Sequence, residues 1–203
     1  MRLPMFPLNS VVFPSTAVPL RVFETRYQRL LDRVMRADGQ FGIVLIERGH
    51  EVGGDDVRFD VGSRVKVVAM SPIGTSNDRA IVVVGMNRIR VQEWLPDDPH
   101  PEADVEELTE EVCDSSQELE EALISLRTVL ALASEIGANV AALKLDFAED
   151  PIAASFQLSS LSPLAAIDQQ KLLEAPDSRT RLTVAKQMLD EQADLLRYRL
   201  SLS

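Results

Sequence analysis

The chain has 203 residues, a formal net charge of −11 and one cysteine, Cys113. A strongly acidic protein repels phosphate, so nucleic acid is not an expected partner, and one cysteine excludes an internal disulfide framework and any multi-cysteine metal site. No apolar run reaches the roughly 18 residues of a membrane span, and prolines interrupt the start where a signal peptide would be apolar. We therefore expect a cytoplasmic protein that does not enter a membrane.

The first part of the chain is typical of β-strands, with Val/Ile-rich runs of strand length. Prolines in its first extended segments confine those segments to sheet edges or strand ends. An amphipathic helix over residues 24–37 interrupts the strands, and Gly39 follows it where a left-handed cap is expected. The predicted strands cover residues 2–6, 17–22, 41–47, 64–70, 80–86 and 88–95, and residues 64–95 form an antiparallel meander.

An acidic segment follows the predicted strands. Residues 96–114 carry nine acidic side chains and no basic one. Such a run of like charge favours exposure to solvent. We interpret residues 97–114 as an acidic connector or an edge strand.

The rest of the chain is typical of helices. The first helix is predicted to run from a capping box to about Ile136, with Gly137 as its stop, and the last to about Arg199. Short polar side chains before a helix, or before Pro at its first position, mark helix starts. The predicted starts are Ser115 with Glu118, Asp150 before Pro151, Ser162 before Pro163, and Asp177 or Ser178.

These patterns predict an α+β fold in which strands and helices are segregated. The expected organisation is a β-rich part over residues 1–96, the acidic segment over 97–114, and an α-helical bundle over 115–203.

The sequence offers no constellation for chemistry. It has no phosphate-binding loop and no nucleophile elbow. The histidines, His50 and His100, have no Cys or His partner at metal-ligand spacing, and Cys113 is surrounded by acidic residues that make it a poor nucleophile. We expect no catalytic, cofactor-binding or metal-binding residues. A Ser–Lys pair, or a site assembled from scattered residues, stays open as an alternative, with Lys144, Lys171 and Lys186 in the helical part.

The opening stretch, residues 3–35, resembles the start of the Lon protease N-terminal domain. Its prolines, Phe-Glu and Arg-Tyr pairs fall in the order of that family, and later matches run through Asp150-Pro151 to Arg181-Leu182. Several of the matching positions are interpreted as structural. These are Phe23, Glu24, Arg26, Tyr27, Gly62, Gly85 and Arg88.

The resemblance implies a fold and a role. The fold is a PUA-like pseudobarrel with one inserted helix, followed by a helical bundle, and the role is recognition of unfolded or tagged polypeptide. Lon proteases continue into ATPase and Ser–Lys protease domains that are not found here. We therefore expect a stand-alone, non-catalytic adaptor or regulator of proteolysis, with a separate protease or ATPase as a candidate partner. The alternatives are an RNA- or small-ligand-binding barrel of the PUA class, and a hidden hydrolase.

The segment over residues 8–19 is rich in apolar side chains and poor in charge. A receptor for unfolded chains needs an exposed apolar surface or an open sheet edge. We hypothesise that part of this region contacts the client peptide, while the alternative is that its side chains pack in the core. The candidate residues are Met5, Val11, Phe13, Pro14 and Val18.

Overall fold

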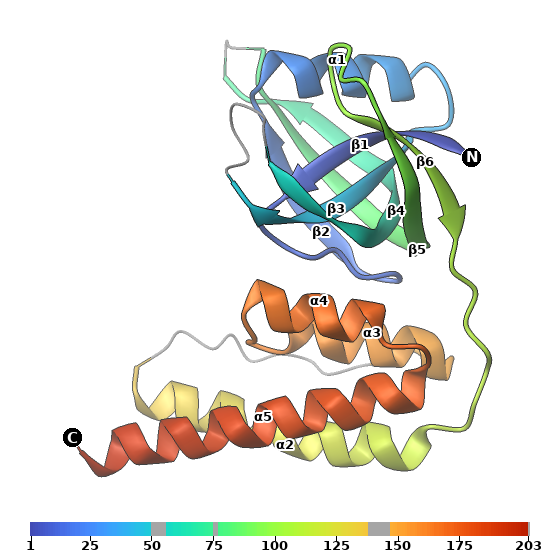
Figure 1. Ribbon diagram of the computed structural model, residues 1–203. Helices are drawn as coiled ribbons and strands as arrows, with labels where there is room; N and C mark the ends of the chain where they lie inside the picture. Colours follow the sequence, from blue (N-terminus) through green and yellow to red (C-terminus); the bar gives the residue numbers. More distant parts are fainter. Residues whose placement is uncertain (50–55, 75–76, 138–146, 203) are drawn as a thin grey trace. The chain divides into compact units, whose positions relative to one another are not determined.

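The computed structural model describes residues 1–49, 56–74, 77–137 and 147–202. It divides into two compact units, Met1–Thr109 and Glu110–Ser203 (Figure 1). The division falls inside the segment that we expected to be an acidic connector. Each unit has its own elements and its own buried side chains.

As far as its residues are described, the first unit is a mixed sheet with one helix. Its order is β2-β5-β4-β3-β1-β6, and β6 also pairs with β5, so the ladder of five strands closes on itself while β2 extends β5. All pairs are antiparallel except β1 with β3. The strands are β1 Arg2–Leu8, β2 Ala17–Val22, β3 Gln40–Arg48, β4 Val57–Pro72, β5 Arg79–Leu95 and β6 Glu102–Glu107.

Three expectations about strands are wrong in detail. Residues 80–86 and 88–95 belong to one continuous strand, β5, which bends through register shifts instead of ending. The acidic segment contains β6, which pairs on both sides and is therefore neither a free connector nor an edge. The first strand is no edge either. It pairs with β6 over residues 2–4 and with β3 over residues 5–8, so each stretch needs only one partner and tolerates proline.

The core of the first unit has two apolar clusters. One lies beneath helix α1, Thr25–Val34, where the Phe6 and Tyr27 rings stack with centroids 4.1 Å apart. The other gathers Met5 and Ile89 with their neighbours on β1, β3, β5 and β6. The helix is shorter than predicted, but Gly39 has the expected left-handed φ of 73°.

Within residues 110–137 and 147–202 the second unit has four helices, and α2 and α5 run parallel along each other. Ser115 at the start of α2 bonds Ser178 at the start of α5, and Ser125 further along bonds Asp190. Among the described residues, no helix combines the length and apolarity that a membrane crossing requires. The helices are α2 Ser116–Glu135, α3 Pro151–Leu161, α4 Ala166–Glu174 and α5 Ser178–Ser201.

Two predicted helix starts are confirmed by side-chain caps. The Asp150 carboxylate accepts from the Ala153 N–H at 2.8 Å, and Asp177 accepts from the Thr180 N–H at 2.8 Å. Both satisfy a backbone donor that the first turn leaves without an intrahelical partner. Gly137 also lies past the end of α2, with φ 83°.

The other two predicted starts are wrong in mechanism or place. Ser115 precedes α2, but its hydroxyl makes no cap bond and donates to Ser178 instead, while Glu118 pairs with Arg179. Ser162 follows the last residue of α3, and its hydroxyl donates a hydrogen bond to the Leu158 carbonyl. Helix α4 therefore begins later, at Ala166. Ser115 bonds a residue that is distant in sequence, and Ser162 bonds the preceding turn of its own helix. A local sequence pattern does not distinguish these partners from a helix cap.

Candidate functional site

The outward face of the β2–β5–β4 sheet carries apolar side chains in contact with solvent. Side chains alternate along β2: Ala17, Pro19 and Arg21 are exposed, while Val18 and Leu20 are half-buried and pack against the core. This alternation follows from the two-residue period of a strand. The sheet therefore buries one face and presents the other.

A groove of about 440 Å³ lies on this outward face. We call it the outer groove, and Met70 at its wall is 44% exposed while Val68 beside it is 57% exposed. Exposed apolar side chains that gather in one place, unlike scattered ones, mark binding surfaces. The outer groove is lined by Pro19, Leu20, Arg21, Ala69, Met70, Ser71, Ala80, Ile81 and Val82.

Strand register builds the floor of the outer groove. Pro19 on β2 lies opposite Val82 on β5, which lies opposite Ala69 on β4. The register of β4 shifts just before Ala69, and such a bulge bends the strand and increases its twist. As a result Val68, Ala69 and Met70 are all exposed in succession.

The rim of the outer groove is polar, and one of its strands is an edge. Arg21 donates to Asp78 at 2.6 Å, with the arginine side chain 65% exposed. In the described part of the chain β2 pairs with β5 alone, so its second side is open. An open strand beside an apolar groove can hold an extended polypeptide through backbone hydrogen bonds and side-chain contacts together.

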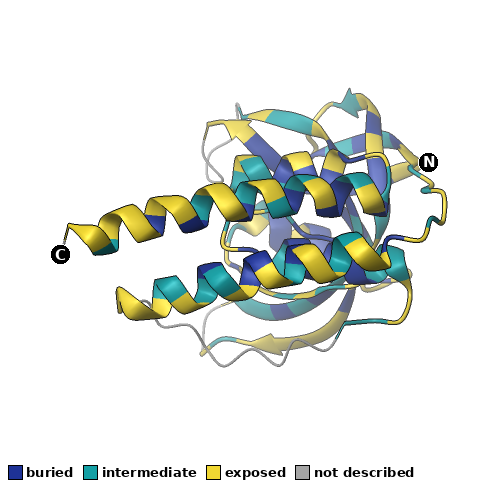
Figure 2. Ribbon diagram, turned by 90° about the horizontal axis from the view of Figure 1, so that it is seen from below, coloured by how far each residue is buried: buried dark blue, intermediate teal, exposed yellow. Residues whose placement is uncertain are grey.

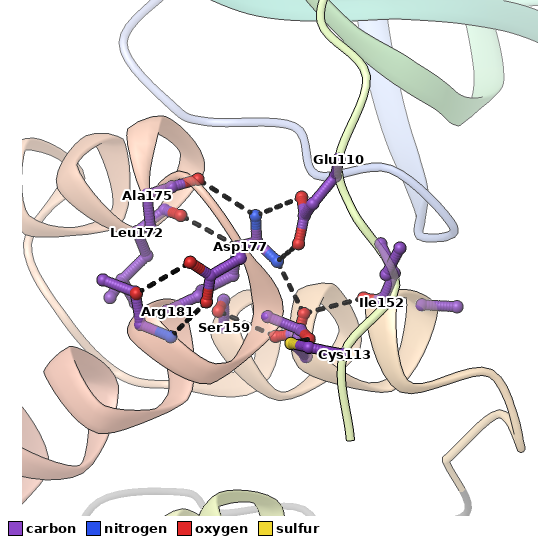
Figure 3. A network of polar contacts seen from close by, with 12 residues as sticks. Glu110, Cys113, Ile152, Ser159, Leu172, Ala175, Asp177 and Arg181 are labelled. Carbon is purple, nitrogen blue, oxygen red and sulfur yellow. Dashed lines mark hydrogen bonds and ion pairs between the residues drawn. The ribbon is translucent and has the colours of Figure 1, made fainter. Parts of the chain in front are cut away.

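A buried ion pair dominates the second unit (Figure 3). The Arg181 side chain is fully buried and its guanidinium bonds both oxygens of Glu110, at 3.0 and 2.7 Å. It also donates to the Ser155 hydroxyl and to the carbonyls of Leu172 and Ala175. All five N–H donors of a guanidinium can thus be satisfied by protein groups. This arrangement is suited to holding structure and leaves the charge no open side for a substrate.

Sequence reasoning noted Arg181 only as part of a family motif and missed its partner. Glu110 stands in the acidic segment among other acids, and nothing in the local pattern distinguishes it. The Phe156 ring lies 3.7 Å beneath the guanidinium carbon and completes the enclosure. Only the fold brings these three residues together.

The peptide-binding candidates of the opening region are mostly inside the first unit. Met5 and Phe13 are 0% and 1% exposed, and Pro14 is buried as well. Val11 and Val18 are half-buried, and Val18 packs against the larger core cluster. Buried side chains offer no surface to a peptide, so the core-packing alternative describes Met5, Phe13 and Pro14 in this structure.

Two motif glycines permit close backbone approach. A Cβ on Gly85 would come within 2.1 Å of the Phe13 carbonyl oxygen, where Ser15 donates its N–H to the Gly85 carbonyl. A Cβ on Gly62 would come equally close to the Ile43 carbonyl oxygen. Both positions therefore exclude any side chain, and Arg88 near Gly85 is itself buried at 5% exposure.

The Phe-Glu and Arg-Tyr motif sits at the start of α1. Arg26 donates to Glu24 at 3.0 Å, and its guanidinium carbon lies 4.5 Å from the Tyr27 ring centroid. Burial raises the pKa of the Tyr27 hydroxyl well above its usual range, so it stays protonated. Phe23, in contrast, is 50% exposed.

A second charged pair lies in the first unit. Arg58 bonds Asp56 through two nitrogens, at 2.6 and 3.1 Å, and its guanidinium carbon lies 4.5 Å from the Trp94 ring. Burial opposes ionisation of Asp56, but the hydrogen bond and charge of Arg58 lower the pKa of that carboxyl overall. Both groups stay charged and bonded, which suits a structural role.

The remaining titratable candidates form no chemical cluster. His100 is buried, with Nδ1 3.2 Å from the Pro101 carbonyl oxygen, and Cys113 lies 3.2 Å from the Ser178 hydroxyl. His50 and Lys144 lie outside the described residues. Within the described ranges no group of three or more His, Cys, Asp or Glu side chains could hold a metal ion.

Comparison with known proteins agrees with this description. A family model described as the ATP-dependent protease La (LON) substrate-binding domain matches residues 2–191. "Lon protease 2" of Herpetosiphon aurantiacus is 30% identical across 97% of this chain, which covers 24% of that protein. "Lon protease" of Syntrophus aciditrophicus is 26% identical across 96% of the chain and 25% of its own length. The chain thus spans about a quarter of these curated relatives.

Solved structures support the same assignment. A Lon N-terminal domain protein from Xanthomonas campestris superposes with a TM-score of 0.66 at 25% identity, covering 94% of this chain and 98% of that one. The N-terminal domain of a Mycobacterium avium complex Lon protease shares the fold with a TM-score of 0.62, at 20% identity and with 96% and 98% coverage. The family model, the relatives and the fold converge, and the chain belongs to the Lon substrate-binding domain family.

Proposed function

We propose that this chain binds unfolded or tagged polypeptides non-covalently through the outer groove, and that it performs no covalent chemistry itself. The observation that carries the proposal is the groove beside the open edge of β2, whose exposed apolar residues are Pro19, Ala69 and Met70. Membership of a substrate-binding family supplies the class of ligand, since its model is described as substrate-binding.

The physical basis is the complementarity between the outer groove and an unfolded chain. Unfolded polypeptides expose apolar side chains and unpaired backbone groups, which native proteins bury. Pro19, Met70 and Val82 offer shallow apolar contact, and the open side of β2 offers backbone carbonyls and the N–H groups of residues other than Pro19. Such a surface favours exposed apolar segments without requiring one sequence.

In this proposal the protein acts as an adaptor or regulator of proteolysis, delivering or withholding clients from a separate protease or ATPase. The chemistry of degradation would reside in that partner. The likeness of the closed sheet to PUA barrels is a further part of the proposal, and RNA or small-ligand binding is the competing function for such a barrel. The net charge of −11 favours polypeptide over RNA.

Binding of a model client tests the proposal. A fluorescently labelled protein is kept unfolded by reduction of its disulfides, and its native oxidised form serves as the matched control. We expect saturable binding of the unfolded form and at least about tenfold weaker binding of the native form. Equal affinity for both forms, or salt-sensitive binding of RNA in preference to either, would contradict it. Turnover of casein by the pure protein would show that it is an enzyme.

A further inference from the structure

Helix α5 carries a second apolar stripe besides the one it buries. Leu195, Tyr198 and Leu202 are 60%, 65% and 71% exposed, and they recur at alternating spacings of three and four residues. The same spacing continues backwards to Met188 and Val184, which are half-buried. Figure 2 shows the last turns of α5, next to the C-terminus, mostly in the yellow of exposed residues.

The stripe has the spacing of a coiled-coil seam. In heptad notation Met188, Leu195 and Leu202 occupy a positions, and Tyr198 and Val184 occupy d positions. The buried side of α5 uses different residues, including Leu182, Leu189 and Leu196, which are at most 5% exposed. One helix therefore presents two separate apolar seams, and only one of them has a partner in the described part of the chain.

A groove lies beside the first half of this stripe. It has a volume of about 420 Å³ and lies between α4 and α5, with Val184, Met188 and Leu195 along its α5 side. Leu164 and Ala165, at and just before the start of α4, line its other side. A second helix lying on the stripe would meet these apolar side chains on two sides, flanked by the polar residues Asp168, Lys171, Gln187, Glu191 and Gln192 that also line the groove.

The charges beside the stripe identify the occupant. Asp194 lies at a g position and Arg199 at an e position, and in a parallel pair g of one heptad faces e of the next heptad in the other helix. The Asp194 carboxylate is 78% exposed although it bonds Arg197 within the helix. Arg199 is exposed and has no ion-pair partner among the described residues. A second copy in parallel register supplies both complementary contacts, whereas an antiparallel copy would not align them.

We propose that α5 of a second copy of this chain covers the stripe as a parallel, in-register helix pair. This inference is independent of the proposed function. Glu191 occupies the remaining d position, where two copies place two carboxylates close together. Like charges at such positions weaken pairing, so the dimer is concentration-dependent, and the Glu191→Leu variant associates at least about tenfold more tightly.

Sedimentation velocity of the full chain from about 1 µM to about 1 mM measures the association. We expect a monomer–dimer equilibrium, and the Leu195→Asp variant raises its dissociation constant at least about tenfold. Asp194→Arg and Arg199→Asp each weaken the dimer, and the double exchange restores it. Thr183→Arg, which changes an exposed residue off the stripe, leaves it unchanged. A monomer throughout the range, or a dimer indifferent to Leu195→Asp, overturns the proposal.

Cross-linking tests the parallel register by itself. In a Cys113→Ser background, Val184→Cys places two thiols opposite each other when the copies run in parallel register, whereas an antiparallel pair over the same stripe places them at its opposite ends. Oxidation is expected to give a disulfide-linked dimer, while Thr183→Cys in the same background gives none. Circular dichroism checks that each variant keeps its helices. A folded Val184→Cys protein that dimerises without cross-linking contradicts the parallel register.

Discussion

The two units of this protein use different means to fix their elements in place. In the first unit the buried polar side chains are few, and the ladder of backbone hydrogen bonds sets which strand lies beside which. In the second unit the helices satisfy their backbone groups internally, so only side chains can fix one helix against another. That unit accordingly buries Arg181 and several serines that bond across or along its helices.

This difference predicts which substitutions destabilise each unit most. A sheet with an apolar interior is damaged by a charge placed inside it or by a side chain where two backbones touch. A helical unit with a buried polar network is damaged when one member of the network is removed, because its partner then stays buried without compensation. Substitutions of matched chemistry in the two units should therefore have different effects.

The largest effect is expected from Phe13→Asp in the first unit. Phe13 is 1% exposed, so the new carboxylate must be buried without a partner or the unit must open. We expect a loss of about 5 kcal/mol or more in the free energy of unfolding. Fluorescence of Trp94, the one tryptophan, reports on this unit because its side chain packs against the smaller core cluster.

Phe23→Asp is the matched control for that experiment. Phe23 is 50% exposed, so the same replacement should change the free energy of unfolding by about 0.5 kcal/mol or less. If Phe13→Asp kept the native Trp94 signal, the placement of Phe13 in the core would be wrong. The opening region would then return as a candidate surface.

The next largest effect is expected from Arg181→Met in the second unit. The substitution keeps much of the apolar stem but leaves the Glu110 carboxylate, 5% exposed, without its bidentate partner. Breaking a buried pair from one side costs about 3–5 kcal/mol. Denaturant unfolding followed by far-ultraviolet circular dichroism measures the loss in this helical unit.

Two companion variants sharpen the result. Arg179→Met removes a guanidinium whose side chain is 56% exposed and paired with Glu118, so it should cost less than about 1 kcal/mol. Replacing both Arg181 and Glu110 by apolar residues should recover part of the loss, because neither charge then stays buried alone. A double variant as unstable as the sum of its single variants would show that the two side chains do not act as a pair.

A smaller effect is expected at the start of α5. Asp177 accepts hydrogen bonds from the N–H and hydroxyl of Thr180, and the backbone hydrogen bond lowers the pKa of its carboxyl despite partial burial. Asp177→Ala should cost about 1 kcal/mol at pH 7, whereas Asp177→Asn retains a cap and should cost less.

The pH dependence of that difference has a defined sign. Because the carboxyl pKa is lowered on folding, the cap contributes fully above the usual carboxyl pKa of about 3.9. Its contribution is lost as the pH falls through the lowered value of the folded state. Urea titrations of wild type and Asp177→Ala at several pH values should therefore converge in acid. A gap that widens on acidification would contradict the assignment of Asp177 as an ionised cap.

Sequence patterns predicted local structure well where local interactions decide it. The amphipathic stripe that includes Tyr27 and Leu30 predicted α1, and Asp150 and Asp177 predicted two helix starts through bonds that span one turn. The α+β class followed from the change of period along the chain. These features depend on neighbours in sequence, which a pattern contains.

Long-range partners were beyond a local pattern. The sequence predicted Ser115 as a helix cap, but its hydroxyl donates to Ser178. Because Ser178 is distant in sequence, a local pattern does not contain this contact. Strand β6 lies in the acidic segment, and its charge favoured exposure to solvent. The structure instead pairs β6 with both β1 and β5. A low-charge apolar segment is compatible with side chains that point inward or outward, so the sequence left open whether Phe13 contacts a peptide or packs in the core. The outer groove was missed for a similar reason, since its residues come from three strands.

The most direct test of the account is the binding of an unfolded client to Met70→Asp compared with Val57→Asp. The two side chains are 44% and 42% exposed on the same strand, but only Met70 lines the outer groove. Both variants should keep the free energy of unfolding within about 0.5 kcal/mol of wild type. We predict that Met70→Asp weakens client binding at least about tenfold while Val57→Asp does not. Equal affinity of the two folded variants would contradict the assignment of the outer groove as the binding surface.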